Sequence, residues 1–201
     1  MLKKGYTVEE LLNLPRIKSL PSLTSVDDLD YKIMSHLSIN DLRTLSYINH
    51  YTYDQLHKDE LLWINKLKEE GLYESIPDID LTNINWLKLY KTLKTIKKVI
   101  DDIKDGDRIK YTINEKYIKY FDKLASDLNI PVRMHPRYPE FKIGYIRFGM
   151  HSPRANNIDK YIGYYITSAI NDKDIHITHN QLVTLLFDLY YNNIILKIKQ
   201  T

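Results

Sequence analysis

Two histidines separated by two residues, His176 and His179, have a spacing that could supply ligands to zinc. His135 and His151 precede them in the same half of the chain. A tetrahedral site needs further ligands, and the chain has no cysteine that could provide thiolates. We therefore interpret these side chains as surface or hydrogen-bonded histidines, and we predict neither a metal site nor a cofactor.

Basic side chains are the second set that could do chemistry, because rows of them bind phosphates. One row follows a helical stretch, and another is interleaved with Tyr138 and Tyr145. The first row contains Lys88, Lys91, Lys94 and Lys98, and the second contains Arg133, Arg137, Arg147 and Arg154. The whole chain has 29 Lys and Arg against 26 Asp and Glu, a net charge of only +3. We interpret both rows as solvated surface and predict no nucleic-acid partner.

Residue types that perform catalysis form no recognisable arrangement in this chain. The absence of cysteine excludes disulfides and cysteine nucleophiles. The six glycines do not fall in a phosphate-loop frame, and no serine has a nucleophile-elbow context. The acidic pairs Asp27-Asp28 and Asp101-Asp102 stand at predicted helix ends, where they cap or terminate. We predict no catalytic residue and no enzymatic activity.

The composition, 43% hydrophobic and 27% charged residues, is typical of a soluble globular protein. No apolar run approaches the roughly 18 residues that a membrane-spanning helix needs, and the N-terminus does not resemble a signal peptide. We expect no membrane partner.

The first half of the chain is predicted to form several short helices. Most begin with a polar capping residue, which is followed by a stripe of apolar residues. Ser25 with Asp28, Ser38 with Asp41, and Asp59 are predicted N-caps, and Gly71 is a predicted left-handed stop. The first stripe contains Val26, Leu29, Ile33 and Leu37, and that of the fourth helix contains Leu62, Trp63 and Leu67. A longer helix follows from about Ile84 to Ile103, with Trp86, Tyr90, Leu93, Ile96 and Ile100 on its apolar face.

The second half mixes strand and helix patterns in the order β-α-β-β-β-α-β. The predicted strands are 109–113, 141–148, 161–167, 174–178 and 194–199. Asn114 is the predicted cap of a helix that reaches about Asn129, and Thr178 with Gln181 forms a capping box for the last helix. The fold class is therefore α+β, with a largely antiparallel sheet. We predict an N-terminal helix and connector at 1–24, a helical module at 25–104, and a small α+β domain at 108–201.

Residues 25–63 resemble the F-box family. The matching residues are Ile33-Met34-Ser35-His36-Leu37 in the first helix, Ser38, Asp41 and Leu42 in the turn, Ile48, Asn49, Tyr51 and Tyr53 in the middle, and Leu62-Trp63 at the end. Many F-box chains continue with a Trp-x-x-Leu-Tyr helix, which Trp86-Leu87-Lys88-Leu89-Tyr90 resembles. The resemblance covers about half of the chain.

The resemblance implies a helical module that docks on a Skp-type adaptor of a cullin ubiquitin ligase, with residues 108–201 holding an unknown protein target. The expected partner-binding residues are Val26, Leu29, Ile33, Met34, Leu37, Leu42 and Leu45. F-box chains rich in Ile, Lys, Asn and Tyr are frequent in large AT-rich DNA viruses. By that analogy the protein would be viral, would act in the host cytoplasm, and would use the host ligase.

One departure from the family pattern supports an alternative. F-boxes usually begin with Leu-Pro, and Ser25 and Val26 stand at those positions. The Ser25/Asp28 capping box can start the helix in place of proline, but the Leu-Pro pair is part of the surface that the adaptor grips. The alternative is a structural or assembly protein, for example a virion component, that retains the F-box fold without ligase binding.

Overall fold

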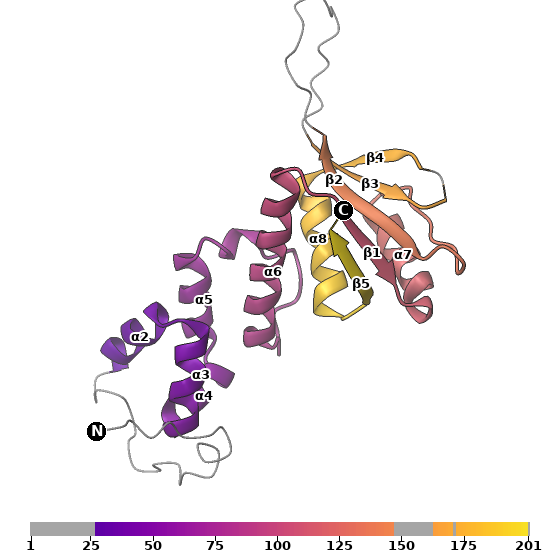
Figure 1. The fold of residues 1–201 in the computed structure, drawn as a ribbon. Helices are drawn as coiled ribbons and strands as arrows, with labels where there is room; N and C mark the ends of the chain where they lie inside the picture. Colours follow the sequence, from indigo (N-terminus) through magenta and orange to yellow (C-terminus); the bar gives the residue numbers. More distant parts are fainter. Residues whose placement is uncertain (1–26, 147–162, 171, 201) are drawn as a thin grey trace, which may run out of the picture. The chain divides into compact units, whose positions relative to one another are not determined.

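The computed structural model describes residues 27–146, 163–170 and 172–200. The described chain combines helices with one antiparallel sheet, which confirms the α+β fold class. It divides into two compact units (Figure 1), here called the helical unit and the sheet unit and described separately. The helical unit includes the described residues up to 76 and residues 80–90, and the sheet unit includes residues 77–79 and the described residues from 91 onward. The division falls inside helix α6 (Trp86–Lys104), whereas the sequence places it after that helix, at 104–108.

Four short helices precede α6 in the helical unit. They are α2 (Asp27–His36), α3 (Ile39–Ile48), α4 (His50–Lys58) and α5 (Glu60–Glu69). The Ser38 hydroxyl accepts a hydrogen bond from the Asp41 backbone N–H at 3.2 Å, and the Asp59 carboxylate accepts one from the Leu62 N–H at 3.2 Å. Gly71 follows α5 with φ +65°, the left-handed region that favours glycine. These predicted start and stop signals are confirmed, while the predicted connector and the Ser25 cap lie outside the described residues.

The core of the helical unit is centred on Trp63, which is 0% exposed. Its indole N–H donates a hydrogen bond to the Leu56 carbonyl at 3.0 Å, and its ring lies 5.4 Å from that of Tyr90. The buried apolar side chains of α2 to α5 are Met34, Leu42, Leu56, Leu62, Trp63 and Leu67. The predicted inward positions of Leu62, Trp63 and Leu67 are confirmed.

A buried lysine links three helices of this unit. Lys66 is 3% exposed, and its ammonium donates hydrogen bonds to the backbone carbonyls of Ser35 at 3.0 Å and Leu37 at 2.7 Å. These carbonyls lie at the C-terminal end of α2, where the helix leaves its last acceptors without internal partners. The ammonium is also 3.5 Å from the Glu70 carboxylate, to which the Tyr90 hydroxyl donates. Lys66 therefore ties the end of α2 to α5 and to the first turns of α6.

The sheet unit follows the predicted order of elements. They are β1 (Ile109–Ile113), α7 (Ile118–Asp127), β2 (Glu140–Ile146), β3 (Gly163–Ser168), β4 (Asp174–Ile177), α8 (His179–Tyr191) and β5 (Ile195–Gln200). The strands are arranged β4-β3-β2-β1-β5, and every neighbouring pair is antiparallel. The capping box of Thr178 and Gln181 at the start of α8 is present as predicted.

The helix predicted to begin at Asn114 starts later than expected. The Asn114 side chain accepts a hydrogen bond from the Lys116 N–H at 3.2 Å and begins a 3-10 turn, Glu115–Tyr117. Helix α7 begins only at Ile118 and ends at Asp127. The Tyr117 N–H donates to the Asn114 carbonyl at 2.8 Å, which is the i+3 hydrogen bond of a 3-10 turn and delays the start of the α-helix.

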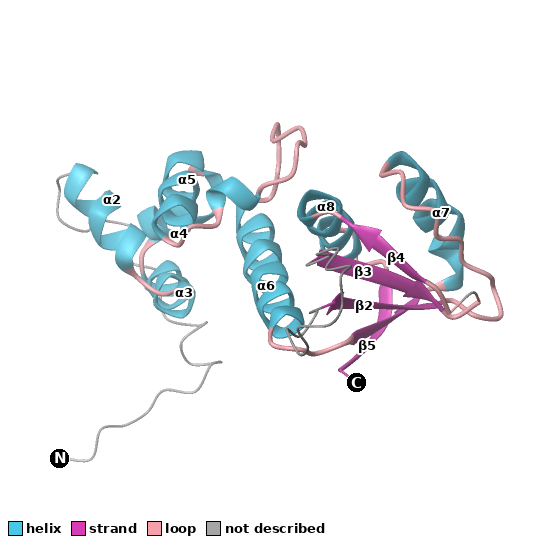
Figure 2. Ribbon diagram, turned by 90° about the horizontal axis from the view of Figure 1, so that it is seen from above, coloured by secondary structure: helices cyan, strands magenta, loops and turns pink. Residues whose placement is uncertain are grey.

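Helices α7 and α8 cover the same face of the sheet (Figure 2). Tyr111 and Phe141 are cross-strand partners on that face, with stacked rings 5.2 Å apart. Phe121 of α7 lies 5.0 Å from Phe141, and Tyr190 of α8 lies 6.3 Å from Tyr111. The opposite face carries the alternate residues of each strand, because side chains alternate along a strand. It includes Lys110, Thr112, Lys142, Thr167 and Lys199.

A close contact holds β2 and β3 together on that opposite face. Gly144 and Tyr165 are cross-strand partners, and a Cβ at position 144 would lie 2.5 Å from the Tyr165 hydroxyl oxygen. The tyrosine ring therefore lies directly over the glycine, and Tyr165 is only 4% exposed.

Candidate functional site

The apolar residues of α2 point in two different directions. Leu29 and Ile33 are 46% and 37% exposed. Because helical residues four apart lie on one face, these two form an exposed apolar pair, here called the α2 ridge. Asp30 and Met34, also four apart, are 0% exposed. The inward side of α2 is therefore Asp30 and Met34, and the predicted stripe is displaced from it by one residue.

This arrangement corrects part of the predicted docking set. Met34 and Leu42 are both 0% exposed and belong to the core, so a partner cannot contact them while the helices stay packed. Leu37 and Leu45 are half-buried, and Val26 lies outside the described residues. Leu29 and Ile33 are the predicted residues whose side chains are exposed to a partner.

Two further exposed apolar residues were not predicted. Leu61, at the start of α5, is 62% exposed, and Tyr47 of α3 is 48% exposed. A signal for Leu61 was present in the sequence, since three consecutive apolar residues on a helix span too wide an arc for all to face one core. With Leu62 and Trp63 inward, Leu61 must face outward.

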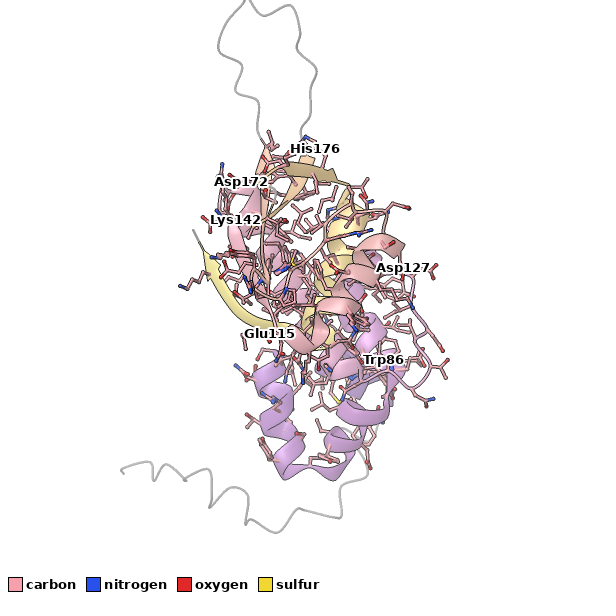
Figure 3. All side chains as sticks on the ribbon, turned by 90° about the vertical axis from the view of Figure 1, so that its right-hand side faces the viewer. Trp86, Glu115, Asp127, Lys142, Asp172 and His176 are labelled. Atoms are coloured by element: carbon pink, nitrogen blue, oxygen red, sulfur yellow. The ribbon has the colours of Figure 1, made fainter. Side chains whose placement is uncertain are left out.

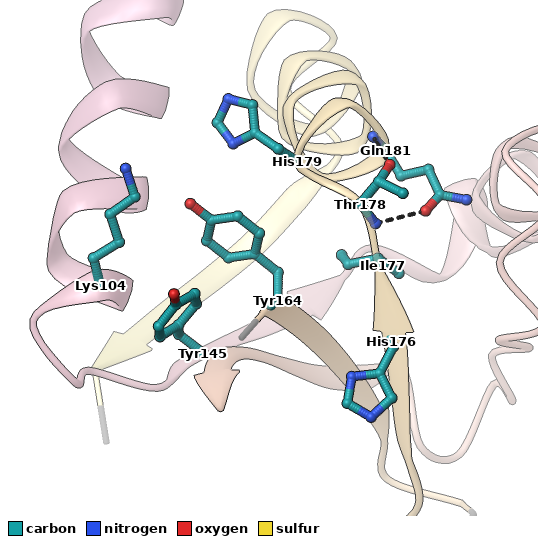
Figure 4. Close-up of a pocket in the computed structure, with 9 residues that line it drawn as sticks. Lys104, Tyr145, Tyr164, His176, Ile177, Thr178, His179 and Gln181 are labelled. Atoms are coloured by element: carbon teal, nitrogen blue, oxygen red, sulfur yellow. Dashed lines mark hydrogen bonds between the residues drawn. The ribbon is translucent and has the colours of Figure 1, made fainter. Parts of the chain in front are cut away.

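The sheet unit contains a pocket of about 550 Å³, here called the tyrosine pocket (Figure 4). The rings of Tyr145 and Tyr164 meet edge to face at 5.4 Å, and His179 lies 5.8 Å from Tyr164. Lys104, from the last turn of α6, lines another side, and the Thr178 capping box lies beside the strand ends. No motif in the sequence indicated this pocket, because its walls come from α6, β2, β3 and the segment that joins β4 to α8.

The Tyr164 hydroxyl in this pocket has a raised pKa. Burial raises the pKa of Tyr164, and the neighbouring Tyr145 and Asp101 raise it further. A phenol of raised pKa donates and accepts hydrogen bonds but does not serve as a base or nucleophile near pH 7. The pocket therefore presents a hydrogen-bonding hydroxyl between the aromatic rings of Tyr145 and His179.

The histidines considered as zinc ligands line the same pocket without converging. Figure 4 shows His179 turned toward Tyr164 and His176 turned away from it. Across residues 27–146, 163–170 and 172–200, no group of three or more His, Asp or Glu side chains is placed to hold a metal ion.

The basic rows considered in the sequence are spread over separate surfaces. Lys91, Lys94 and Lys98 are exposed along α6, and Lys88 is half-buried. Arg133 and Arg137 are exposed near Tyr138, which is 57% exposed, whereas Arg147 and Arg154 lie outside the described residues. Tyr145, which was grouped with these arginines, belongs instead to the tyrosine pocket.

Comparisons with protein-family models, with curated proteins and with solved structures find no match to this chain. In the part of the chain that the structure describes, no helix combines the length and the apolar character needed to cross a membrane.

Proposed function

We propose that this chain is an F-box-type adaptor, which docks on a Skp-type subunit of a cullin ubiquitin ligase through its helical unit. The sheet unit would hold the protein to be modified. In this role the chain performs no chemistry. It raises the effective concentration of a target near the ubiquitin-loaded enzyme by carrying two binding surfaces on one chain.

The α2 ridge is the observation that supports this proposal most directly. Lys66 anchors the end of α2 to the rest of the unit, so the helix is held in place while Leu29 and Ile33 face outward. An exposed apolar pair on an anchored helix is the kind of surface that a partner's groove covers. The family resemblance points to the same helix, since α2 occupies the first helix of the F-box pattern.

The test is a calorimetric titration of the full chain against a purified Skp-type adaptor. The informative variant carries Leu29→Asp and Ile33→Asp, because burying each side chain contributes about 1.5–3 kcal/mol. We expect this variant to bind at least about tenfold more weakly than the wild type. The matched control carries Ile170→Asp and Leu196→Asp, two residues of the sheet unit that are 48% and 60% exposed.

Two results would contradict the proposal. One is the absence of adaptor binding by a wild-type chain that circular dichroism shows to be folded. The other is equal weakening by the α2 variant and its control, since that would show a general effect of added charge. Absence of binding would favour the structural or assembly role, to which the missing Leu-Pro pair also points.

A further inference from the structure

A row of three lysines crosses the face of the sheet opposite to α7 and α8. The strand register places Lys142 of β2 directly across from Lys110 of β1, and Lys110 directly across from Lys199 of β5. Neighbouring strands are about 4.8 Å apart, so the three positions lie within about 10 Å. Like charges directly opposite each other in a sheet are destabilising. The three ammonium groups of this basic row therefore repel one another.

Three carboxylates lie around the basic row, those of Glu140, Asp172 and Asp174. Glu140 forms an ion pair with Lys110. Asp174 lies further along the same row, on β4, and accepts a hydrogen bond from the Thr167 hydroxyl. Within the described part of the chain, neither Lys142 nor Lys199 forms an ion pair, and both are exposed.

A shallow hollow of about 390 Å³ lies beside the row, lined by Lys110, Lys142, Glu140, Thr167 and Asp172 among others. Figure 3 labels Lys142 and Asp172 on this part of the sheet. The hollow gives an incoming side chain a place next to the ammonium groups of Lys110 and Lys142.

We infer that the basic row is a docking surface for an acidic, extended segment of a partner protein. Side chains on one face of an extended segment recur about every 7 Å, so two carboxylates at that spacing match the span of the row. Their approach would relieve the repulsion between Lys142, Lys110 and Lys199. The acidic segment would belong to the protein that the sheet unit holds, and this biological role rests on the proposed function.

An acidic protein segment fits this face better than a single-stranded nucleic acid. Proteins that bind single strands pair basic side chains with exposed aromatic rings on which bases stack. The aromatic residue on this part of the sheet, Tyr165, is only 4% exposed because it packs over Gly144. It offers no ring face to a base.

The experiment measures fluorescence anisotropy of a labelled peptide of alternating Glu and Ser with the full chain at low salt. The variant Lys142→Gln, Lys199→Gln removes two charges and leaves the Lys110–Glu140 ion pair intact. The matched control, Lys97→Gln, Lys98→Gln, removes two exposed charges from α6. We expect the sheet variant to lose about tenfold or more in affinity, the control to change less than about twofold, and binding to weaken with added salt.

A charge-reversed variant gives an independent reading. Lys142→Glu, Lys199→Glu should abolish binding of the glutamate peptide and create binding of a matched Lys-Ser peptide. Three outcomes would overturn the inference: no binding of the glutamate peptide, equal losses in the sheet variant and the α6 control, or tighter binding of a labelled oligothymidylate than of the peptide. No adaptor is present in this experiment, so its failure is distinguishable from failure of the proposed function.

Discussion

In the helical unit a lysine is buried and leucines are exposed, whereas in the sheet unit lysines are exposed and tyrosines are buried. Lys66 is 3% exposed and Leu61 is 62% exposed, while Tyr111 of β1 is 0% exposed. In the helical unit, the core around Trp63 and the hydrogen bonds of Lys66 hold the helices in place, while Leu29 and Leu61 stay outside that core. The sheet unit can expose a row of like charges because strand pairing and stacked rings hold it together from the other face.

Replacing Lys66 should produce the largest loss of stability. Lys66→Met leaves the carbonyls of Ser35 and Leu37 without their donor and the Glu70 carboxylate without its cation. We expect the free energy of unfolding to fall by about 3 kcal/mol, in the range for removing one partner of a buried ion pair. Both tryptophans, Trp63 and Trp86, belong to the helical unit, so urea unfolding followed by tryptophan fluorescence reports on it.

The control for this prediction is Lys68→Met, at an exposed position of the same helix. Its effect should stay within about 0.5 kcal/mol, as for ordinary surface substitutions. If the two variants unfold at the same urea concentration, the buried lysine is not what holds α2 in place.

A substitution at Gly144 should have the next largest effect, and it should be confined to the sheet unit. Gly144→Ala places a Cβ 2.5 Å from the Tyr165 hydroxyl oxygen, so the two strands or the ring must shift. We expect a loss of about 2 kcal/mol, within the range measured for overpacking. Thermal unfolding followed by far-ultraviolet circular dichroism measures this loss.

A second substitution tests the cause of that loss. Gly144→Ala combined with Tyr165→Val should lose less stability than the sum of the two single variants, because the shorter side chain removes the clash. Additive losses in the double variant would show that the glycine is needed for a reason other than the ring above it.

The smallest expected effect concerns the tyrosines of the sheet unit. It is a loss of stability that appears only in alkali. Burial, followed by its hydrogen bond to Asp188, raises the pKa of Tyr120 from 10.0 to about 12. Burial also raises the pKa of Tyr111 and Tyr190, whose hydroxyls lie 3.4 Å apart. A folded-state pKa above the unfolded value gives stability that is complete below about pH 10 and is lost as pH rises through the folded pKa.

The sheet unit should therefore lose stability progressively above pH 10. Phenolate absorbance near 295 nm gives the measurement, with the folded chain showing fewer ionised tyrosines at pH 11 than the urea-unfolded chain. The variant Tyr120→Phe should remove part of that difference. Identical titration curves for folded and unfolded chains would contradict the assigned burial.

Local signals in the sequence were sufficient for most of the elements and their starts. Ser38, Asp59 and the Thr178–Gln181 box act over three residues, so the sequence alone determines where they begin a helix. The docking set predicted from the sequence was wrong for Met34 and Leu42, which belong to the core. The apolar stripe of the sequence does not distinguish the exposed Leu29 and Ile33 from the buried side of the helix, which carries Asp30 and Met34.

The candidate sites depend on contacts between residues far apart in the sequence, which no local sequence pattern reveals. The Lys66 link joins residues 29 and 31 positions apart, and its acceptors are backbone carbonyls that any sequence would offer. The basic row requires the register of β1 with both β2 and β5, and a shift of one residue would move a lysine to the covered face. The tyrosine pocket likewise exists only once four separate segments have been brought together.

The packing of Tyr165 over Gly144 limits which substitutions can be accepted at these two positions during evolution. Neither position can vary alone without loss, because any larger residue at 144 meets the ring and any smaller residue at 165 uncovers the glycine. The two positions should therefore be inherited as a pair. In divergent homologues, a residue larger than glycine at 144 should occur together with a smaller residue at 165. This covariation would identify a shared β2–β3 register even where overall sequence identity is low.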